Sequence, residues 1–288
     1  MKIDGKTKLV GIIGWPIEHT FSPNFHNAAF MEAGLDWVYL PLSVLPNDLK
    51  AAVDGLKAMG FMGFNVTMPH KKIVIEYLDG LSDEAALADA VNTVKREGDR
   101  LIGHNTDGRG FIESLKMDAD FIPEGKDALI IGAGGAARSV AISLAMSRIS
   151  SLTVVNRTLK RAETLTALIR DNFPECEVKV LSQNDEKIVS AKKSSQLIVN
   201  ATSTGMRDNP GLPIDMDSIG TGHLVYDLIY DPVETDFLKR ASELGAKTIN
   251  GIKMLLYQGM IAWEIWTGKK PPADKMAETL NLLIERKA

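Results

Sequence analysis

One segment constrains the fold of this chain more than any other. Residues 127–131, DALII, form a short apolar run that leads directly into Gly132-Ala133-Gly134-Gly135-Ala136-Ala137-Arg138, and a helical pattern follows. In such a loop the first glycine allows a tight turn, the second lets the backbone approach a pyrophosphate, and a small residue at the position of Ala137 permits close helix packing. The free N–H groups of the following helix then face the phosphates. This order of strand, glycine loop and helix predicts a doubly wound α/β fold that binds a dinucleotide.

The residues after the next strand indicate which dinucleotide is bound. The apolar run 151–155 ends in Asn156-Arg157-Thr158, and Arg161 follows within one helical turn. NAD enzymes commonly have an acidic residue here that binds the adenosine ribose, whereas an arginine suits the additional phosphate of NADP. The guanidinium groups of Arg157 and Arg161 could bracket that phosphate, with the Thr158 hydroxyl as a further donor. We therefore expect NADP; the alternative is that both arginines only line the solvated start of a helix.

Two series of alternating apolar and amphipathic segments divide the chain. The first has a β-α-β-α-β rhythm and ends in residues 91–106, which we interpret as an antiparallel hairpin around Glu97-Gly98-Asp99. The second begins at Asp127 and has the Val/Ile/Leu-rich strands of a parallel sheet covered on both faces. Two helices without a further strand end the chain. We expect two α/β domains: an N-terminal substrate-binding domain with a mostly parallel sheet (1–106 plus about 252–288), on which the C-terminal helices pack, and a Rossmann-like NADP-binding domain (107–251).

Composition excludes several classes of function. A net charge of −4 over 288 residues provides no overall basic field for nucleic acid or an anionic membrane. No segment approaches the roughly 18 apolar residues of a membrane helix. Glycine and proline residues interrupt the N-terminal apolar run, which is unlike a signal peptide. Cys176 is the only cysteine, and the five histidines have no metal-binding spacing. We expect a cytoplasmic protein without a metal, nucleic-acid partner or membrane contact. The protein could form a homodimer.

Further motifs occur along the chain in a recognisable order. They are His19-Thr20-Phe21-Ser22-Pro23 with His26-Asn27, Asn65-Val66-Thr67-Met68-Pro69-His70-Lys71, Asn92-Thr93, Asn105-Thr106-Asp107-Gly108, Asn200-Ala201-Thr202-Ser203-Thr204-Gly205 and Gly251-Ile252-Lys253-Met254-Leu255-Leu256-Tyr257-Gln258. With the glycine loop and Asn156-Arg157-Thr158, the chain resembles the shikimate dehydrogenases over nearly its whole length. The resemblance implies the reversible, NADPH-linked reduction of 3-dehydroshikimate to shikimate in aromatic amino-acid biosynthesis.

Lys71 and Asp107 are the expected catalytic residues. Hydride transfer to a ketone leaves an alkoxide, so a proton donor must lie close to the carbonyl oxygen. Lys71 follows an apolar strand and Pro69, at the kind of strand end where α/β ligand sites form. Asp107 could orient the Lys71 ammonium and bind a substrate hydroxyl, and the resemblance implies a Lys/Asp pair at these positions. The alternative for Lys71 is a solvated loop lysine.

A polyhydroxylated acid needs many hydrogen bonds, and short polar side chains occur at the expected strand and loop ends. By resemblance, Thr20 and Ser22 would hold the carboxylate, while Asn65, Asn92, Asp107 and Gln258 would hold the ring hydroxyls. Thr67 and Tyr230 are the remaining expected substrate residues, and Gly251 and Met254 are expected at the cofactor. Taken singly, each has a structural alternative, because Asn and Thr cap turns, a helical Gln can face solvent, and a tyrosine can end a strand in the core.

Thr20 departs from the family, which usually has serine there. The extra methyl could narrow the carboxylate pocket or change the tolerance for quinate, so a quinate dehydrogenase that uses NAD is an alternative. A non-catalytic NADP-binding regulator is another, against which Lys71 and Asp107 argue. Glutamyl-tRNA reductases have a similar glycine loop, but they need a cysteine in an N-terminal domain, and Cys176 lies far downstream of it.

Overall fold

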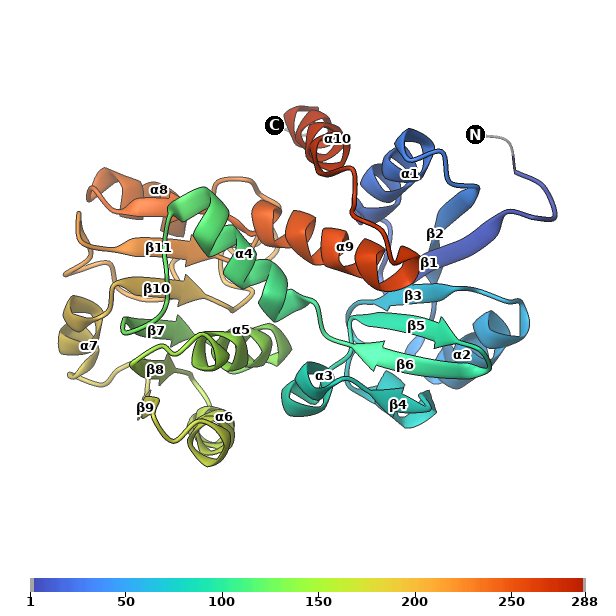
Figure 1. The fold of residues 1–288 in the computed structure, drawn as a ribbon. Coiled ribbons are helices and arrows are strands. Elements are labelled where there is room, and N and C mark those ends of the chain that lie inside the picture. Colours follow the sequence, from blue (N-terminus) through green and yellow to red (C-terminus); the bar gives the residue numbers. More distant parts are fainter. Residues whose placement is uncertain (1–2, 287–288) are drawn as a thin grey trace. The chain divides into compact units, whose positions relative to one another are not determined.

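The computed structural model describes residues 3–286 and contains two compact units, each built around its own six-stranded sheet (Figure 1). The first unit comprises the chain up to Thr106 together with the residues from Leu256 onward, and the second comprises Asp107–Leu255. The chain passes from one unit to the other between Thr106 and Asp107, and returns within helix α9 (Gly251–Thr267). The two sheets differ in how their strands pair.

The sheet of the first unit is mixed. Its strands are β1 (Lys8–Gly14), β2 (Trp37–Ser43), β3 (Gly63–Val66), β4 (Gly80–Leu81), β5 (Thr93–Glu97) and β6 (Arg100–His104), in the order β2-β1-β3-β5-β6-β4. β2 and β3 both pair with β1 in parallel, whereas β5 is antiparallel to β3 and to β6. The antiparallel hairpin predicted within residues 91–106 is therefore confirmed.

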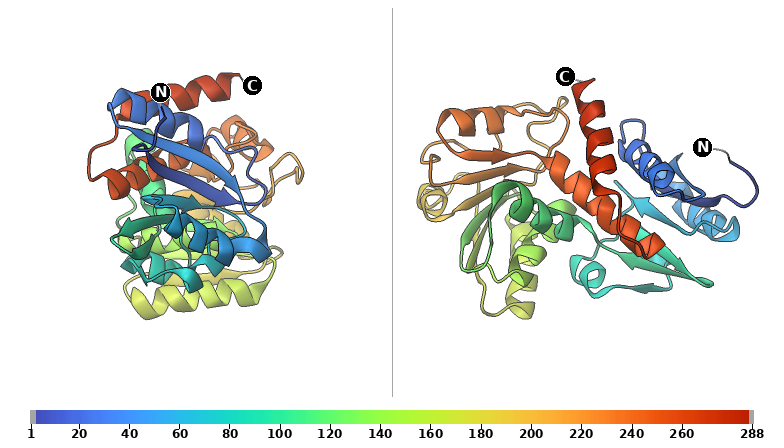
Figure 2. Two further views of the ribbon diagram at one scale, coloured as in Figure 1. Left: turned by 90° about the vertical axis from the view of Figure 1, so that its right-hand side faces the viewer. Right: turned by 45° about the horizontal axis from the view of Figure 1, so that its top comes forward.

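Helices cover both faces of this sheet. They are α1 (Ser22–Glu32), α2 (Leu49–Ala58), α3 (Asp83–Ala88) and α10 (Ala273–Glu285), with 3₁₀ turns η1 (Pro46–Asp48) and η2 (Ile73–Tyr77). The apolar side chains of α2, Leu49, Val53 and Leu56, are buried in one cluster with Phe64 and Val66 of β3. Residues alternate faces along a strand, so Gly63 and Asn65 face the other side, where Trp266 of α9 donates a hydrogen bond to the Val94 carbonyl. α10 lies beside α1, as predicted for the C-terminal helices (Figures 1 and 2).

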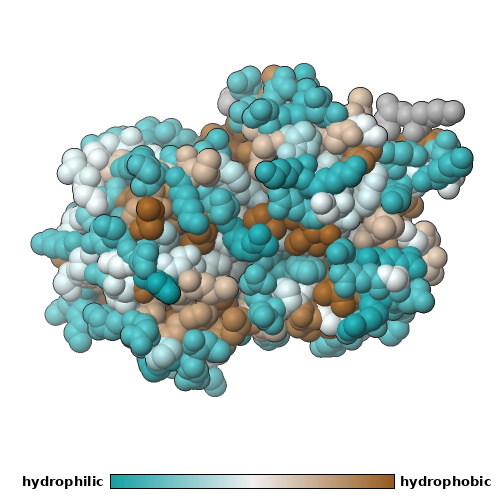
Figure 3. Space-filling view, viewed as in Figure 1, coloured by the Kyte–Doolittle hydropathy of each residue, from teal (hydrophilic) through white to brown (hydrophobic). Residues whose placement is uncertain are grey.

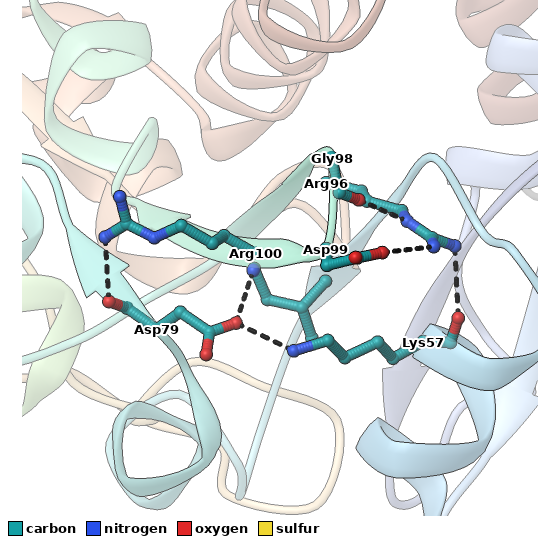
Figure 4. A network of polar contacts seen from close by, with 7 residues as sticks. Lys57, Asp79, Arg96, Gly98, Asp99 and Arg100 are labelled. Carbon is teal, nitrogen blue, oxygen red and sulfur yellow. Dashed lines mark hydrogen bonds and ion pairs between the residues drawn. The ribbon is translucent and has the colours of Figure 1, made fainter.

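Asp79 anchors the β5–β6 hairpin to the rest of this unit (Figure 4). Its carboxylate accepts a hydrogen bond from the Leu101 amide at 2.7 Å and pairs with Lys57 at 3.0 Å. These two donors, the amide first, lower the pKa of Asp79. Arg96 extends the network by donating to the Lys57 carbonyl at 3.1 Å. The hairpin is thus held at the end remote from Asn92 and Thr106.

The sheet of the second unit is parallel throughout. Its strands are β7 (Asp127–Ile131), β8 (Ser151–Val155), β9 (Glu177–Leu181), β10 (Leu197–Asn200), β11 (Leu224–Asp227) and β12 (Lys247–Ile249), in the order β12-β11-β10-β7-β8-β9. From β7 the chain builds outward to β9, then returns to place β10 on the other side of β7. Ligands of doubly wound sheets bind at such a reversal, here between the carboxyl ends of β7 and β10.

Helices pack on both faces of the parallel sheet, as the strand composition predicted. They are α4 (Asp107–Ala119), α5 (Gly135–Met146), α6 (Leu159–Asn172), α7 (Ile188–Ser194) and α8 (Asp236–Glu243). Val225 of β11 lies in one core cluster with Phe237 of α8. The next residue, Tyr226, points to the other face, where its ring lies 4.8 Å from that of Phe111 of α4. The doubly wound fold is confirmed.

The surface in Figure 3 is largely hydrophilic, and apolar residues are exposed there in small patches. Within residues 3–286, every helix is too short or too polar to cross a bilayer.

Candidate active site

The strand order of the first unit brings distant polar residues to one sheet edge. β3 ends at Val66, and β5 begins at that same edge because it runs antiparallel, so that Asn65 pairs with Thr93. β6 returns to the edge, with His104 opposite Thr93, and Asn105 and Thr106 follow. Four of the predicted substrate residues, Ser22, Asn65, Asn92 and Gln258, are buried in this unit.

A continuous hydrogen-bond network links these side chains. The Asn65 amide nitrogen donates to the Asn92 carbonyl at 3.0 Å and to the Thr93 hydroxyl at 2.9 Å. The Thr93 hydroxyl contacts the Asn92 side-chain oxygen at 3.0 Å, and the Asn92 amide nitrogen donates to the Thr106 hydroxyl at 2.9 Å. Thr106 in turn lies 3.5 Å from the Gln258 side-chain oxygen. Each buried polar group thereby gains a partner, as burial requires.

Tyr39 is a member of the network that the sequence did not reveal. Its hydroxyl donates to the Asn65 side-chain oxygen at 2.7 Å. Burial raises the pKa of Tyr39 well above its ordinary value. In the sequence, Tyr39 is one apolar-type residue in the strand WVYLPLS, and no motif marks it. Thr93 and Thr106 occur in the quoted motifs, but their role as links between the two asparagines depends on the strand pairing.

Thr20 and Ser22 lie between β1 and α1. Ser22 is the first residue of α1 and is buried, whereas Thr20 is half-buried. The Thr20 hydroxyl accepts a hydrogen bond from the Ser22 amide at 3.3 Å. A short local contact therefore holds the Thr20 hydroxyl against the start of α1.

Lys71 lies in an anchored turn between β3 and η2. Its backbone carbonyl accepts from the Val91 amide at 2.7 Å, next to Asn92. The preceding residue, His70, is buried with its Nε2 2.7 Å from the Val44 carbonyl, and Thr67 accepts from the His70 amide at 3.0 Å. The half-buried Lys71 side chain thus starts from a backbone that is fixed on both sides.

Asp107 belongs to the second unit, where it is the buried first residue of α4. A helix N-terminus favours a negative charge. Gly108 allows α4 to approach α5 closely, because a Cβ on Gly108 would lie 1.9 Å from the Ser143 hydroxyl of α5. Asp107 is therefore held by the helix that packs against the one following the glycine loop.

The glycine loop has the form that its sequence predicts. Gly132 has a φ of +113°, which side chains rarely allow, and a Cβ there would lie 2.9 Å from the Ala201 carbonyl at the end of β10. At Gly134 and Gly135 a Cβ would meet nothing within 4 Å. Gly134, Gly135 and Ala136 are exposed at the start of α5, whereas Ala137 is fully buried. Open space beside a helix N-terminus at the strand reversal fits a pyrophosphate.

The segment after β8 presents exposed cations. Arg157, Thr158 and Arg161 are exposed, and Asn156 holds the turn by donating to the Thr158 carbonyl at 2.8 Å. Among residues 3–286, the side chains of both arginines lack any hydrogen bond or ion pair to the protein. Two guanidinium groups that face solvent beside the end of β8 fit a phosphate monoester.

The ends of β10 and β11 carry a buried polar cluster. Asp227 accepts from the Thr235 hydroxyl at 2.7 Å, the Asn200 amide at 3.0 Å and the Ile229 amide at 3.1 Å. Burial raises the pKa of Asp227, and these donors oppose the shift. The cluster shapes the loop that leads to Tyr230, whose pKa burial also raises.

Gly251 and Met254 lie in the first turns of α9, and both are buried. A Cβ on Gly251 would lie 2.1 Å from the Leu228 carbonyl just beyond β11. The packing of α9 against this loop therefore accounts for the glycine.

Sequence profiles of known families match three segments of the chain. The shikimate dehydrogenase substrate binding domain matches residues 12–94, the shikimate / quinate 5-dehydrogenase family matches residues 118–216, and the shikimate 5'-dehydrogenase C-terminal domain matches residues 251–280. A shikimate dehydrogenase (NADP(+)) of Geobacter metallireducens is 43% identical over 286 residues, which cover 99% of this chain and 100% of that protein. The chain belongs to the shikimate dehydrogenase family.

Solved structures of shikimate dehydrogenases have the same fold. One in complex with NADP+ matches with a TM-score of 0.91 at 41% identity, over 98% of each chain. The shikimate 5-dehydrogenase from Listeria monocytogenes, in complex with shikimate and NAD, matches with a TM-score of 0.92 at 38% identity, over 97% of this chain and 98% of that one.

Proposed function

We propose that this chain catalyses the reversible reduction of 3-dehydroshikimate to shikimate with NADPH, in the biosynthesis of aromatic amino acids. The observation that carries the proposal is full-length identity of about 40% to proteins named shikimate dehydrogenase (NADP(+)). The enzyme is thus an NADP-dependent oxidoreductase. The two compact units suit a division of labour, with substrate held by the first and cofactor by the second.

Lys71 and Asp107 are the proposed catalytic residues. NADPH supplies the hydride when bound, and the alkoxide that forms on the substrate needs a proton. The Lys71 ammonium donates this proton in reduction and takes it back in the oxidation of shikimate. Asp107 holds the ammonium in place and accepts a hydrogen bond from a substrate hydroxyl. The anchored turn of Lys71 and the helix start at Asp107 support these roles, because catalytic groups act best from a fixed backbone.

The remaining predicted residues bind the two ligands. Thr20 and Ser22 hold the substrate carboxylate, and Asn65, Asn92 and Gln258 hold ring hydroxyls. Their membership of one buried, hydrogen-bonded network or its adjoining loop supports this assignment. Thr67 and Tyr230 complete the substrate site.

The cofactor is bound by the loop and cations of the second unit. Gly132, Ala133, Gly134, Gly135 and Ala136 receive the pyrophosphate, and Asn156, Arg157, Thr158 and Arg161 receive the phosphate on the adenosine ribose. Gly251 and Met254 line the nicotinamide end. The open space at Gly134 and the exposed arginines support the fit to NADP. The cytoplasmic location and the homodimer stay predictions.

The test is the rate of NADPH formation when purified protein is given shikimate and NADP. We expect turnover by the wild type and its loss below detection in Lys71→Ala and in Asp107→Ala. Both variants should retain the NADP affinity of the wild type, measured by calorimetry. Full activity in either variant would contradict its catalytic role, and an inactive wild type would contradict the function.

A further inference from the structure

Tyr39 occupies a central position beneath the proposed substrate residues. It lies on β2 and pairs with Val10 of β1, whereas Asn65 lies on β3 and pairs with Ile12 on the other side of β1. The Tyr39 phenol thus spans β1 to donate its 2.7 Å hydrogen bond to the Asn65 side-chain oxygen. One hydroxyl group therefore holds the side-chain oxygen of a proposed substrate residue that lies two strands away.

Tyr39 is itself held at its backbone and at its ring. The Asn27 side chain bonds both the amide and the carbonyl of Tyr39, at 2.8 and 2.9 Å. The His26 ring stacks on the Tyr39 ring with centroids 4.6 Å apart and planes 5° apart. Tyr39 is 1% exposed. A side chain fixed in this way defines the position of its hydroxyl.

The contacts of Asn65 settle which way its amide points. Its nitrogen gives its two hydrogens to the Asn92 carbonyl and the Thr93 hydroxyl. A backbone carbonyl can only accept, so the nitrogen must face it, and the side-chain oxygen must face Tyr39. That oxygen has two lone pairs, of which Tyr39 uses one. Asn65 can therefore accept one further hydrogen bond and can donate none without losing a protein contact.

We propose that Tyr39 is a positioning residue for substrate binding, which fixes the Asn65 side-chain oxygen so that it accepts a hydrogen bond from a ring hydroxyl of the substrate. The inference rests on the proposed function, since it assigns Asn65 to a ring hydroxyl of shikimate. Of the proposed functional residues, Tyr39 hydrogen-bonds to Asn65, which binds substrate, and so it acts on affinity for shikimate. It leaves the proton transfer at Lys71 and the binding of NADP unchanged.

The first test is Tyr39→Phe, which removes one oxygen and keeps the ring. We expect the KM for shikimate to rise about tenfold, because the buried Asn65 side-chain oxygen loses its donor, while kcat and the KM for NADP stay within about twofold. Tyr77→Phe is the matched control, since Tyr77 is a half-buried tyrosine of the same unit on η2. Its kinetic constants should equal those of the wild type.

The second test asks whether Tyr39 acts through Asn65. In the Asn65→Ala background, adding Tyr39→Phe should raise the KM for shikimate less than it does in the wild type, because contacting residues are not additive. An unchanged KM in Tyr39→Phe, a fall of kcat and both affinities together with the melting temperature, or full additivity in the Asn65→Ala background would overturn the proposal. An inactive wild type would overturn the proposed function instead, so the two failures are distinguishable.

Discussion

The polar edge of the first unit and the nucleotide loop of the second are built from different groups. Asn65 and Asn92 are buried, and the network to which they belong satisfies their side chains. At the loop, the groups proposed to meet the cofactor are the backbone amides of the exposed Gly134 and Gly135 and the exposed side chains of Arg157 and Arg161. One region is a set of interdependent side chains, and the other is backbone geometry combined with charge.

This difference predicts different sensitivities. A buried network loses binding energy when any member is removed, because its partners are left unsatisfied. An exposed cationic site acts through charge, which salt screens over about 8 Å at physiological ionic strength. Substitutions in the two regions should therefore separate stability, cofactor affinity and substrate affinity from one another.

The largest expected effect distinguishes two glycines of the same loop. Gly132→Ala combines a φ of +113° with a Cβ 2.9 Å from a carbonyl, and should lower the free energy of unfolding by about 2–4 kcal/mol. Gly134→Ala enters open space and should change that free energy by less than about 0.5 kcal/mol. Its methyl would occupy the path of the pyrophosphate, so its KM for NADP should rise. Urea unfolding and cofactor kinetics check both, and equal effects of the two substitutions on stability would contradict the account of the loop.

Next in size is the loss of the two arginines proposed to bind the phosphate on the adenosine ribose. Arg157→Ala and Arg161→Ala should each raise the KM for NADP about 10- to 100-fold, the range expected for a hydrogen bond to a charged group. The KM for NAD should stay near its wild-type value, since NAD lacks this phosphate. Arg170→Ala, an exposed arginine at the far end of α6, is the matched control. An equal loss for NAD and NADP would show that the arginines serve another purpose.

The pH dependence of stability tests whether water is excluded from the His26 ring, which stacks on Tyr39. Burial lowers the pKa of His26 to about 3, so the folded state stays neutral while the unfolded state takes up a proton below about pH 6.5. Stability attributable to His26 is therefore lost as the pH falls from about 6.5 toward 3, by about 1.4 kcal/mol per pH unit. In His26→Phe this loss should disappear. Relative to that of the wild type, its free energy of unfolding should therefore rise by about 2 kcal/mol as the pH falls from about 7.5 to about 5.0. A constant difference across that range would mean that His26 is solvated.

The smallest expected effect concerns Thr20. Thr20→Ser retains the oxygen that accepts from the Ser22 amide and removes only a methyl group. We expect the KM for shikimate to change less than about threefold, and kcat/KM for quinate to rise relative to shikimate as the pocket widens. The ratio of the two kcat/KM values measures this, and a tenfold loss of activity on shikimate would mean that the methyl group itself supports the site.

Local patterns predicted most of the fold. The glycine loop and the β5–β6 hairpin each depend on residues close in sequence, such as Gly132 and the Glu97-Gly98-Asp99 turn, and the parallel sheet is indicated by the apolar composition of its individual strands. Lys71 and Asn65 could be selected because they lie in motifs that follow a strand. Periodicity and motif order are patterns among residues that are close along the chain. They therefore predict the features that such residues form.

Tyr39 could not be found in that way. Its partner Asn65 is 26 residues away, and the two meet only because β1 lies between β2 and β3 in the sheet. Strand order is a property of the whole unit. From the sequence alone, a tyrosine in an apolar strand is expected to be a residue of the hydrophobic core. Gly251 is a similar case, because the Leu228 carbonyl that requires a glycine there lies in another segment of the chain.

A structure of this protein crystallised with shikimate and NADP is the most direct test of the central claim. We predict that shikimate oxygens lie within hydrogen-bond distance of Ser22, Asn65, Lys71 and Asp107, with the pyrophosphate against the amides of Gly134 and Gly135. Shikimate bound away from the Asn65 network, or a nucleotide whose phosphates avoid the glycine loop, would contradict the account.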